Sequence, residues 1–387
     1  MELARRTRET PESVTLALAA RAKSRAAAGH DVIDMTAGEP DFNAPICVQE
    51  AAARSARSGE VRYTPAAGTA ALRARIAEYM TQTRGVPFEP AEICVCHSTK
   101  HALCGALMAL VDPGDEVLLL RPAWVSYDHQ IRIAGGVVVE ASPRPDMGPD
   151  FEAMRGAIGP RTRGVMLNSP SNPTGYVWTR AEIERLCELS REHDLWILSD
   201  EIYRRLIYAG DADFSPVSLG GDARARTVVL DGASKAYAMT GYRIGFAAGP
   251  KAVAGGIARL HSHMTGCPNA ISQAAYLAAL ESDPPEVGHM LREFDRRRRV
   301  LESGLTRLGL YAPSQRGAFY AFPRVAEYLD ERGSAGFCED LLEQEDLAIV
   351  QGSAFGMDAH VRLAYTLSVE RIEAALERLG GFLAARG

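Results

Sequence analysis

The sequence contains very little lysine. Only four of its 43 lysine and arginine residues are lysine, at positions 23, 100, 235 and 251. Wherever a positive charge alone is needed, this chain uses arginine. Arginine stays protonated and cannot form an imine, whereas a desolvated lysine can lose its proton and act as a nucleophile. Lys235, which follows an apolar run in a turn of small residues, is therefore interpreted as an amine with a chemical role.

Other features are missing as well. No apolar run is long enough to span a membrane, and the charged start is not followed by the apolar core of a signal peptide. The net charge is −6, and the basic run at 296–299 lies in a helical pattern, so neither favours nucleic-acid binding. The cysteines are odd in number and lack metal-type spacing. They predict buried free thiols in a reducing cytoplasm and no metal site.

The 387 residues are enough for two domains. Short apolar runs occur at about 92–97, 115–120, 136–140, 163–168, 195–200, 226–230 and 244–248. Helical patterns separate them, most clearly at 99–111, 123–134 and 179–193. This alternation predicts an α/β fold of three layers, with a mostly parallel seven-stranded sheet covered on both faces. Because no full helix separates the last two runs, one of these strands can join the sheet antiparallel.

The two ends of the chain have a different pattern. A helix at 13–28 and a strand at 31–35 come first, and helices at 47–58 and 69–83 precede the sheet. After the proline pair at 284–285 we expect a helix to 308, a strand at 318–322, a helix at 334–345, strands at 347–350 and 360–366, and a final helix. We therefore expect a large domain at 41–284 and a smaller α+β domain that combines residues 1–40 with residues 285–387.

In an open α/β sheet, ligands bind at the carboxyl ends of the strands. Chemically useful side chains follow most of the predicted strands: Ser98, Thr99 and Lys100 at a helix start, then Trp124, Asn172, Asp200, Tyr203, Ser234, Lys235 and Arg243. An anion site, an aromatic ring, an amide, a carboxylate, a phenol and an amine are thus expected at one edge. Pyridoxal phosphate needs such a set, with a carboxylate for its ring nitrogen, an amine, and a phosphate site.

Each of these side chains has an ordinary alternative role when considered alone. Ser98 is a natural helix N-cap, Asn172 before proline a turn residue, and Asp200 a cap for the next turn. Trp124 is typical of core packing, and Tyr203 and Arg243 fit an exposed surface. The joint placement of all of them at successive strand ends favours the shared site.

Eight segments in order carry a family resemblance: Gly38-Glu-Pro-Asp-Phe, Tyr63-Thr-Pro-Ala-Ala-Gly, Trp124-Val-Ser-Tyr, Asn168-Ser-Pro-Ser-Asn-Pro-Thr-Gly, Ser199-Asp-Glu-Ile-Tyr, Ser234-Lys-Ala-Tyr-Ala-Met-Thr-Gly-Tyr-Arg-Ile-Gly, Gly317-Ala-Phe-Tyr and Val361-Arg-Leu-Ala-Tyr. Over essentially its whole length, the chain resembles the fold-type I pyridoxal-phosphate-dependent aminotransferases. Within them it is most similar to the bacterial aspartate (aspartate/prephenate) aminotransferase branch.

The resemblance implies a role for each matching residue. Lys235 would form the imine with pyridoxal 5'-phosphate and then move the substrate proton. Asp200 would pair with the ring nitrogen, Tyr203 and Asn172 would contact the ring oxygen, and Trp124 would stack on the ring. The phosphate would be held by Ser98, Thr99, Lys100, Ser234 and Arg243, with Tyr63 reaching in from the second subunit of a homodimer.

The resemblance also implies the substrates. Arg362 would clamp the α-carboxylate with help from Gly38, Trp124 and Asn172, although the sequence by itself also fits a surface ion pair at Arg362. Lys100 can meet a side-chain carboxylate, which favours aspartate as donor and 2-oxoglutarate as acceptor in a ping-pong reaction. Closure of the smaller domain over the sheet edge would exclude water.

Some positions depart from the family pattern. Gly232 replaces a serine that binds phosphate in wider relatives, and Ala123 replaces a common tyrosine. Near Pro11 the chain lacks the basic residue linked with prephenate, which argues against that substrate. A β-lyase or a specialised biosynthetic aminotransferase on the same scaffold is the main alternative. A non-catalytic ligand sensor and a nucleotide-binding dehydrogenase are less favoured, because the sequence has neither a DNA-binding segment nor a Gly-x-Gly-x-x-Gly turn after an early strand.

Overall fold

A seven-stranded sheet dominates the computed structural model, which describes residues 2–8, 10–12, 14–208, 210, 212–313 and 315–386. Its strand order is β2-β8-β7-β6-β5-β3-β4. The strands are β2 (Ile93–Cys96), β3 (Glu116–Leu120), β4 (Val137–Ala141), β5 (Thr162–Asn168), β6 (Trp196–Asp200), β7 (Thr227–Gly232) and β8 (Gly245–Ala248). Each coincides with one of the apolar runs of the sequence, so the predicted seven-stranded sheet is confirmed.

The direction of the strands brings the expected site residues to one edge. The pairs within β4, β3, β5, β6 and β7 are all parallel, and only β8 runs antiparallel to its neighbours β2 and β7. Asn168 at the end of β5 is in register with Asp200 at the end of β6. The loops that follow these two strands therefore begin side by side.

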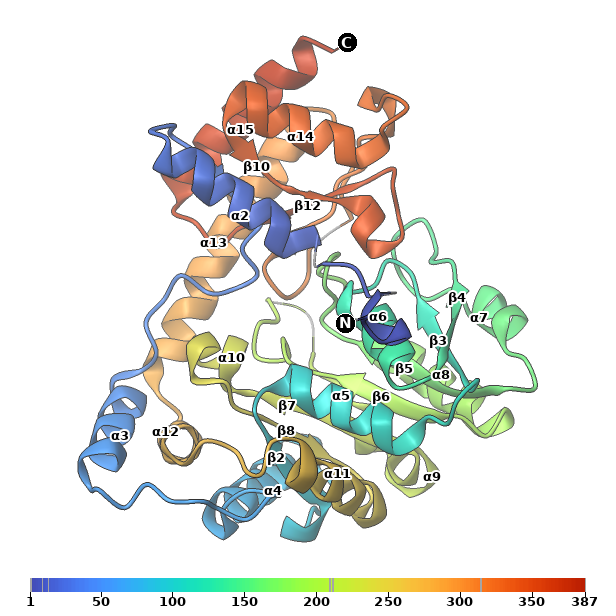
Figure 1. Ribbon diagram of the computed structural model, residues 1–387. Helices are drawn as coiled ribbons and strands as arrows, with labels where there is room; N and C mark the ends of the chain where they lie inside the picture. The colour runs from blue at the N-terminus through green and yellow to red at the C-terminus, as the bar shows by residue number, and fades with distance from the viewer. Residues whose placement is uncertain are drawn as a thin grey trace.

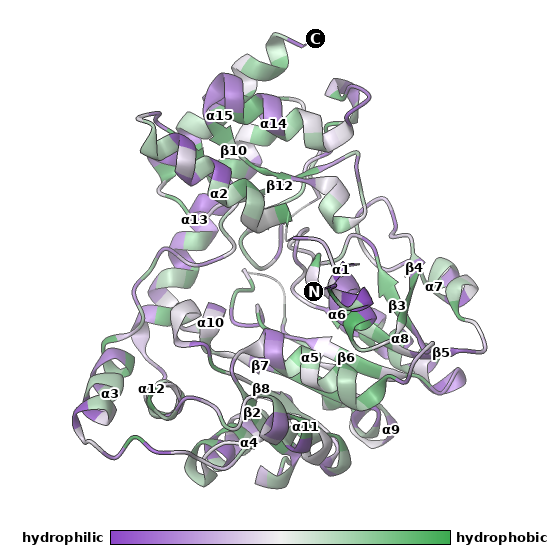
Figure 2. Ribbon diagram, viewed as in Figure 1, coloured by the Kyte–Doolittle hydropathy of each residue, from purple (hydrophilic) through white to green (hydrophobic). Residues whose placement is uncertain are grey.

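Helices cover both faces of this sheet (Figure 1). Apolar residues of α5 (Thr99–Leu110), α6 (Ser126–Ile133) and α11 (Lys251–Met264) pack on one face. The opposite face packs against α4 (Ala70–Arg84), α12 (Ala270–Ser282), α7 (Phe151–Ala157) and α8 (Arg180–Glu192). Because both faces are buried, the strands consist of nearly continuous apolar residues. In Figure 2 the long helix α13 instead alternates between purple and green, as an amphipathic helix does.

The remaining elements connect or extend these layers: α1 (Arg5–Arg8), α2 (Val14–Ala27), β1 (Ile33–Asp34), α3 (Ile46–Arg57), α9 (Gly221–Ala225), α10 (Ala233–Ala236), α13 (Pro285–Arg307), β9 (Tyr320–Ala321), α14 (Gly333–Glu345), β10 (Leu347–Ala348), β11 (Val350–Gln351), β12 (Val361–Ala364) and α15 (Val369–Ala384). Position 13, the expected start of the first long helix, lies outside the described residues. No helix in the described residues is long and apolar enough to cross a membrane.

The N-terminal segment packs with the C-terminal part of the chain. Strand β1 pairs in parallel with β10, and β9, β11 and β12 form a second small sheet. Arg21 of α2 makes ion pairs with Glu339 and Glu343 of α14, and Figure 1 shows the blue helix α2 beside the red end of the chain. The α+β pattern at the two ends of the sequence therefore comes together as one layer above the sheet edge.

Several predicted element bounds differ from the structure, and contacts explain two of the differences. Helix α6 begins at Ser126 and not at residue 123, because the backbone amide of Ala123 donates to the carbonyl of Phe355 (3.1 Å) and stays outside the helix. The strand expected at 347–350 is two strands, since β10 pairs with β1 whereas β11 pairs with β12. Both differences arise from contacts between segments that are distant in the sequence.

Candidate active site

A cavity of about 620 Å³ opens where the carboxyl ends of β5, β6 and β7 meet the N-terminal segment and β12. Twelve of the thirteen predicted site residues line it: Gly38, Ser98, Thr99, Lys100, Trp124, Asn172, Asp200, Tyr203, Ser234, Lys235, Arg243 and Arg362. Tyr63 is the exception, since it is 98% exposed on the surface of the chain. The residues that the sequence only suggested to be neighbours thus share one cavity.

Lys235 lies on the short helix α10, directly after β7. Its amine donates a hydrogen bond to the backbone carbonyl of Gly38. The pKa of Lys235 is lowered from 10.5 to about 8, mainly by burial and also by the positive charges of nearby cations, while Glu39 opposes this shift. A larger share of this amine is therefore neutral, and nucleophilic, near neutral pH than for an ordinary lysine.

Asp200 ends β6 and is buried. Burial raises the pKa of its carboxyl group to about 6, while two hydrogen bonds oppose this effect. The Tyr127 hydroxyl donates to Oδ2 at 2.8 Å, and the Ile202 amide donates to Oδ1 at 3.2 Å. Near neutral pH the side chain is thus a buried carboxylate that is able to stabilise a protonated nitrogen in the cavity.

The first turn of α5 forms an anion-binding corner of the cavity. Ser98 is the N-cap and accepts a hydrogen bond from the His101 amide at 3.2 Å, so its capping role is confirmed. Thr99 Oγ1 is buried and, within the described part of the chain, has no hydrogen-bond partner. A helix N-terminus with a free hydroxyl offers the donors that a phosphate group needs. Arg243 lines the same cavity from the loop before β8.

Close packing explains why position 232 is a glycine. A Cβ atom at this position would lie 2.7 Å from the Gly245 Cα, 2.7 Å from Thr99 Oγ1 and 2.9 Å from the Ile244 carbonyl oxygen. A serine here would therefore displace the Thr99 side chain at the start of α5 or the backbone of β8. The missing hydroxyl at Gly232 is a consequence of the close approach of β7, β8 and α5.

Arg362 projects from β12 into the cavity and is buried. It donates to Asn172 Oδ1 at 3.2 Å and to the Thr36 carbonyl at 2.7 Å, and its guanidinium lies 4.6 Å from the centre of the Tyr320 ring. Its Nε has no hydrogen-bond partner among the described residues. The side chain is therefore held in place with a donor still available for an anionic group.

Tyr127, Tyr320 and Lys23 are among the cavity residues that were not assigned from the sequence. Tyr127 and Tyr320 belong to motifs that were recognised, and Tyr320 lies with its hydroxyl 2.9 Å from that of Tyr203. Lys23 of α2 also lines the cavity, so three of the four lysines of the chain do so. The amine of Lys100, another of these three lysines, lies 4.7 Å from the centre of the Trp124 ring. The scarcity of lysine was the signal that could have identified Lys23.

A buried amine and a buried carboxylate beside an anion-binding helix start define a site for a cofactor with an aldehyde, a basic ring and a phosphate. The sequence matches the model of the class I and II aminotransferase family over residues 30–379. The chain belongs to this family, and it is an aminotransferase with the fold-type I architecture.

Its relatives match over the full length. An aspartate aminotransferase of Geobacillus stearothermophilus is 40% identical, with all of both chains covered. An aspartate/prephenate aminotransferase of Thermus thermophilus is 43% identical, with 98% of each chain covered. The structure of a Thermus thermophilus aspartate aminotransferase with maleate is similar at a TM-score of 0.94 and 41% identity, covering 99% of this chain and all of the other. These relatives do not favour a β-lyase.

Proposed function

We propose that this chain uses pyridoxal 5'-phosphate to transfer the amino group of aspartate to 2-oxoglutarate. The arrangement of Lys235 and Asp200 in one cavity, with the anion-binding corner of α5 beside them, carries the proposal. When bound, this cofactor supplies an aldehyde that condenses with amines and a ring that withdraws electrons from the substrate α-carbon. The unpartnered hydroxyl of Thr99 and the free first turn of α5 fit its phosphate.

Each polar residue of the cavity then has a task. The neutral amine of Lys235 would hold the cofactor at its aldehyde and would take the proton from the substrate α-carbon. Asp200 would keep the ring nitrogen protonated through its negative charge. Tyr203 and Asn172 would hydrogen-bond the ring oxygen, and Trp124 would stack on the ring. Ser98, Thr99, Lys100, Ser234 and Arg243 would hold the phosphate.

The substrate preference rests on two positively charged side chains that line the cavity, Arg362 and Lys100. Arg362 binds the α-carboxylate as a bidentate fork, beside the Gly38 backbone. Lys100, held near the Trp124 ring, meets the second carboxylate of a dicarboxylic amino acid. The relative that was solved with maleate, a four-carbon dicarboxylate, supports a substrate of this charge and length.

We further propose that the site is shared within a homodimer and that a smaller domain closes over it. Tyr63 is exposed on its own chain, as is expected of a side chain that reaches the phosphate of the partner's site. The smaller domain comprises residues 1–40 and 285–387, and the large domain comprises residues 41–284. Because Arg362 and Gly38 both belong to the smaller domain, binding of the α-carboxylate would draw the two domains together.

The test is a half-reaction. Aspartate added to the cofactor-loaded protein without an oxo acid should convert the visible absorption to that of pyridoxamine phosphate, and 2-oxoglutarate should reverse the change. Lys235→Ala should abolish the pH-dependent visible band and the conversion, whereas Lys251→Ala, which removes a surface ion pair with Glu89, should keep both. Release of pyruvate or ammonia with return of the original spectrum would instead identify a lyase.

A further inference from the structure

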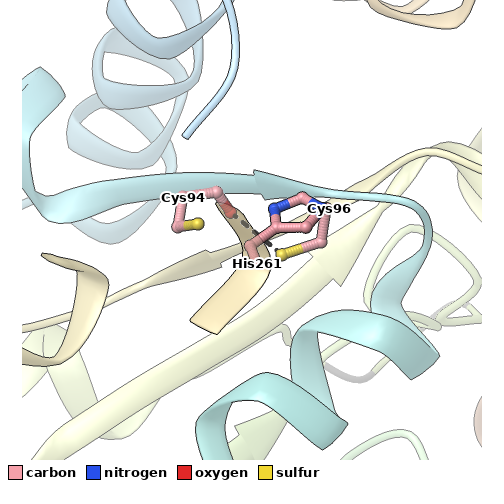
Figure 3. Close-up of side chains that lie close together, drawn as sticks. All are labelled: Cys94, Cys96 and His261. Carbon is pink, nitrogen blue, oxygen red and sulfur yellow. Dashed lines mark hydrogen bonds between the residues drawn. The ribbon is translucent and has the colours of Figure 1, made fainter. Parts of the chain in front are cut away.

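Two thiols and an imidazole meet on the side of the large sheet that packs against α11. Cys94 and Cys96 are two residues apart on β2, so their side chains share a face of the strand. His261 of α11 lies against them (Figure 3). The ligand atoms of all three residues lie within 4.8 Å of one another, and all three residues are buried. No other trio of His, Cys, Asp or Glu side chains in the described residues is arranged in this way.

The imidazole of His261 is buried and makes no hydrogen bond to the residues that the structure describes. The residue is only 2% exposed, and the absence of a partner among the described residues holds for both ring nitrogens. Burying a polar group lowers the free energy of unfolding unless the group makes a hydrogen bond or binds a metal ion. The Cys96 thiol donates weakly to the Cys94 carbonyl at 3.6 Å, so the sulfurs do not satisfy the ring.

We propose that Cys94, Cys96 and His261 form a binding site for a thiophilic divalent cation, with Zn²⁺ as the best match. Thiolates and imidazole are the ligands that zinc prefers. Two thiolates, one neutral imidazole and one divalent ion have no net charge, which suits the apolar residues around the site. On binding, each thiol that is still protonated loses its proton to solvent as its Zn–S bond forms.

The geometry needs only a small adjustment. An ion at the centre of a triangle with sides of 4.8 Å is about 2.8 Å from each corner, compared with bonds of about 2.3 Å to sulfur and 2.0–2.1 Å to nitrogen. His101 is the candidate for a fourth ligand, since its ring centre lies 4.7 Å from that of His261 and its Nδ1 is buried without a partner among the described residues.

The cluster lies close to the anion-binding corner of the cavity. The strand that carries both cysteines leads directly into the N-cap Ser98 of α5. A metal ion would therefore fix the base of the corner to which we assign the cofactor phosphate.

The test is metal binding by the purified, cofactor-loaded protein. After dialysis against Zn²⁺ and then against buffer, the unaltered chain should retain one zinc per chain by mass spectrometry of the metal. Cys94→Ser and His261→Ala should retain almost none. Cys187→Ser, which removes another buried thiol on α8, should retain one. Zinc retention that is unchanged in Cys94→Ser and His261→Ala, or absent from the folded unaltered chain, would overturn the proposal.

A second measurement needs no variant, in case the altered chains do not fold. Co²⁺ should replace zinc in the unaltered protein and give the intense visible bands of a tetrahedral thiolate site, at longer wavelength than the cofactor absorbs. The weak spectrum of octahedral cobalt would exclude the site. Circular dichroism of each sample reports whether the fold is intact.

Discussion

The hydroxyl of Tyr127 sets the charge of Asp200. Burial alone favours the neutral acid, and the hydrogen bond from Tyr127 is the largest effect that opposes it. In the proposed reaction Asp200 assists a protonated ring nitrogen as a carboxylate. We therefore expect the activity at low pH to depend on Tyr127, a residue that need not contact the substrate.

Tyr127→Phe tests this dependence. Loss of the hydrogen bond raises the pKa of Asp200, so the acidic limb of the kcat–pH profile should move to higher pH. Near neutral pH kcat should fall about tenfold or more, because a hydrogen bond to a charged group contributes about 1.5–3 kcal/mol. The measurement is the kcat–pH profile of Tyr127→Phe, compared with that of Tyr311→Phe, a control at an exposed tyrosine. Superimposable profiles for Tyr127→Phe and the unaltered chain would contradict the assignment.

The lowered pKa of Lys235 should be visible in the stability of the cofactor-free protein. Between about pH 8 and 10.5 the unfolded chain binds a proton at Lys235 that the folded chain has lost. The free energy of unfolding therefore rises with pH in this window, by up to about 3 kcal/mol from this group. Below pH 8 the folded state must hold a charged amine in the cavity, which is unfavourable.

Lys235→Met removes this contribution. In urea unfolding without cofactor, the variant should be more stable than the unaltered chain at pH 7, and the difference should shrink towards pH 10. Lys251→Met, at a lysine on the surface, should show no such narrowing with pH. A pH-independent difference for Lys235→Met would mean that the amine is not desolvated.

At the residue level, the sequence identified what an amine, a carboxylate or an arginine can do, but not which polar groups surround it. Lys235, Asp200 and Arg362 stand in recognisable segments. The hydroxyl pair of Tyr203 and Tyr320 joins positions 117 residues apart. His261 of α11 reaches Cys94 of strand β2, so cysteine spacing alone gave no sign of a cluster. These pairings depend on tertiary packing, which a local pattern does not encode.

At the level of elements, β7, β8 and α5 approach one another so closely that Gly232 admits no side chain. Gly232→Ser should lower the free energy of unfolding by about 1–3 kcal/mol, as overpacking of a filled interior does. It should also raise the dissociation constant for pyridoxal phosphate, because Thr99 is displaced. Urea unfolding and cofactor titration measure the two effects.

Gly255→Ala is the matched control for this substitution. Gly255 lies on an exposed part of α11, and an added Cβ would meet no atom within 4 Å. This variant should keep or increase stability by up to about 1 kcal/mol, because alanine is the better helix former. Equal behaviour of the two variants would show that Gly232 is not constrained by packing.

The sequence predicted those helices and strands whose residues follow a single local pattern. Apolar runs located all seven strands of the large sheet, because strands that are buried on both faces have few polar residues. The start of α6 and the division of the segment at 347–350 were not predictable. The first depends on the carbonyl of Phe355 and the second on strand β1, and each partner lies more than 200 residues away in the chain.

At the level of the whole molecule, the proposed sharing of each site between two subunits predicts how mixed dimers behave. If Tyr63 serves the partner's site, a dimer of one Lys235→Ala chain and one Tyr63→Ala chain has one site with both changes and one with neither. Co-expression should then restore activity well above the sum of the two separate variants. Light scattering of the unaltered protein should give the mass of a dimer. Activity no greater than the sum would place Tyr63 in its own chain's site or outside both.

The pairing of β1 with β10 has a consequence for biosynthesis. Strand β1 leaves the ribosome early, but its partner follows only after roughly 300 further residues, about 15–60 s later at common synthesis rates of 5–20 residues per second. By the end of that interval all seven strands of the large sheet have been made, whereas the segment around Gly38 still has no strand to pair with. The side of the cavity that Gly38 and Arg362 line is therefore completed last, and we expect the nascent chain to stay inactive until β10 and β12 have emerged.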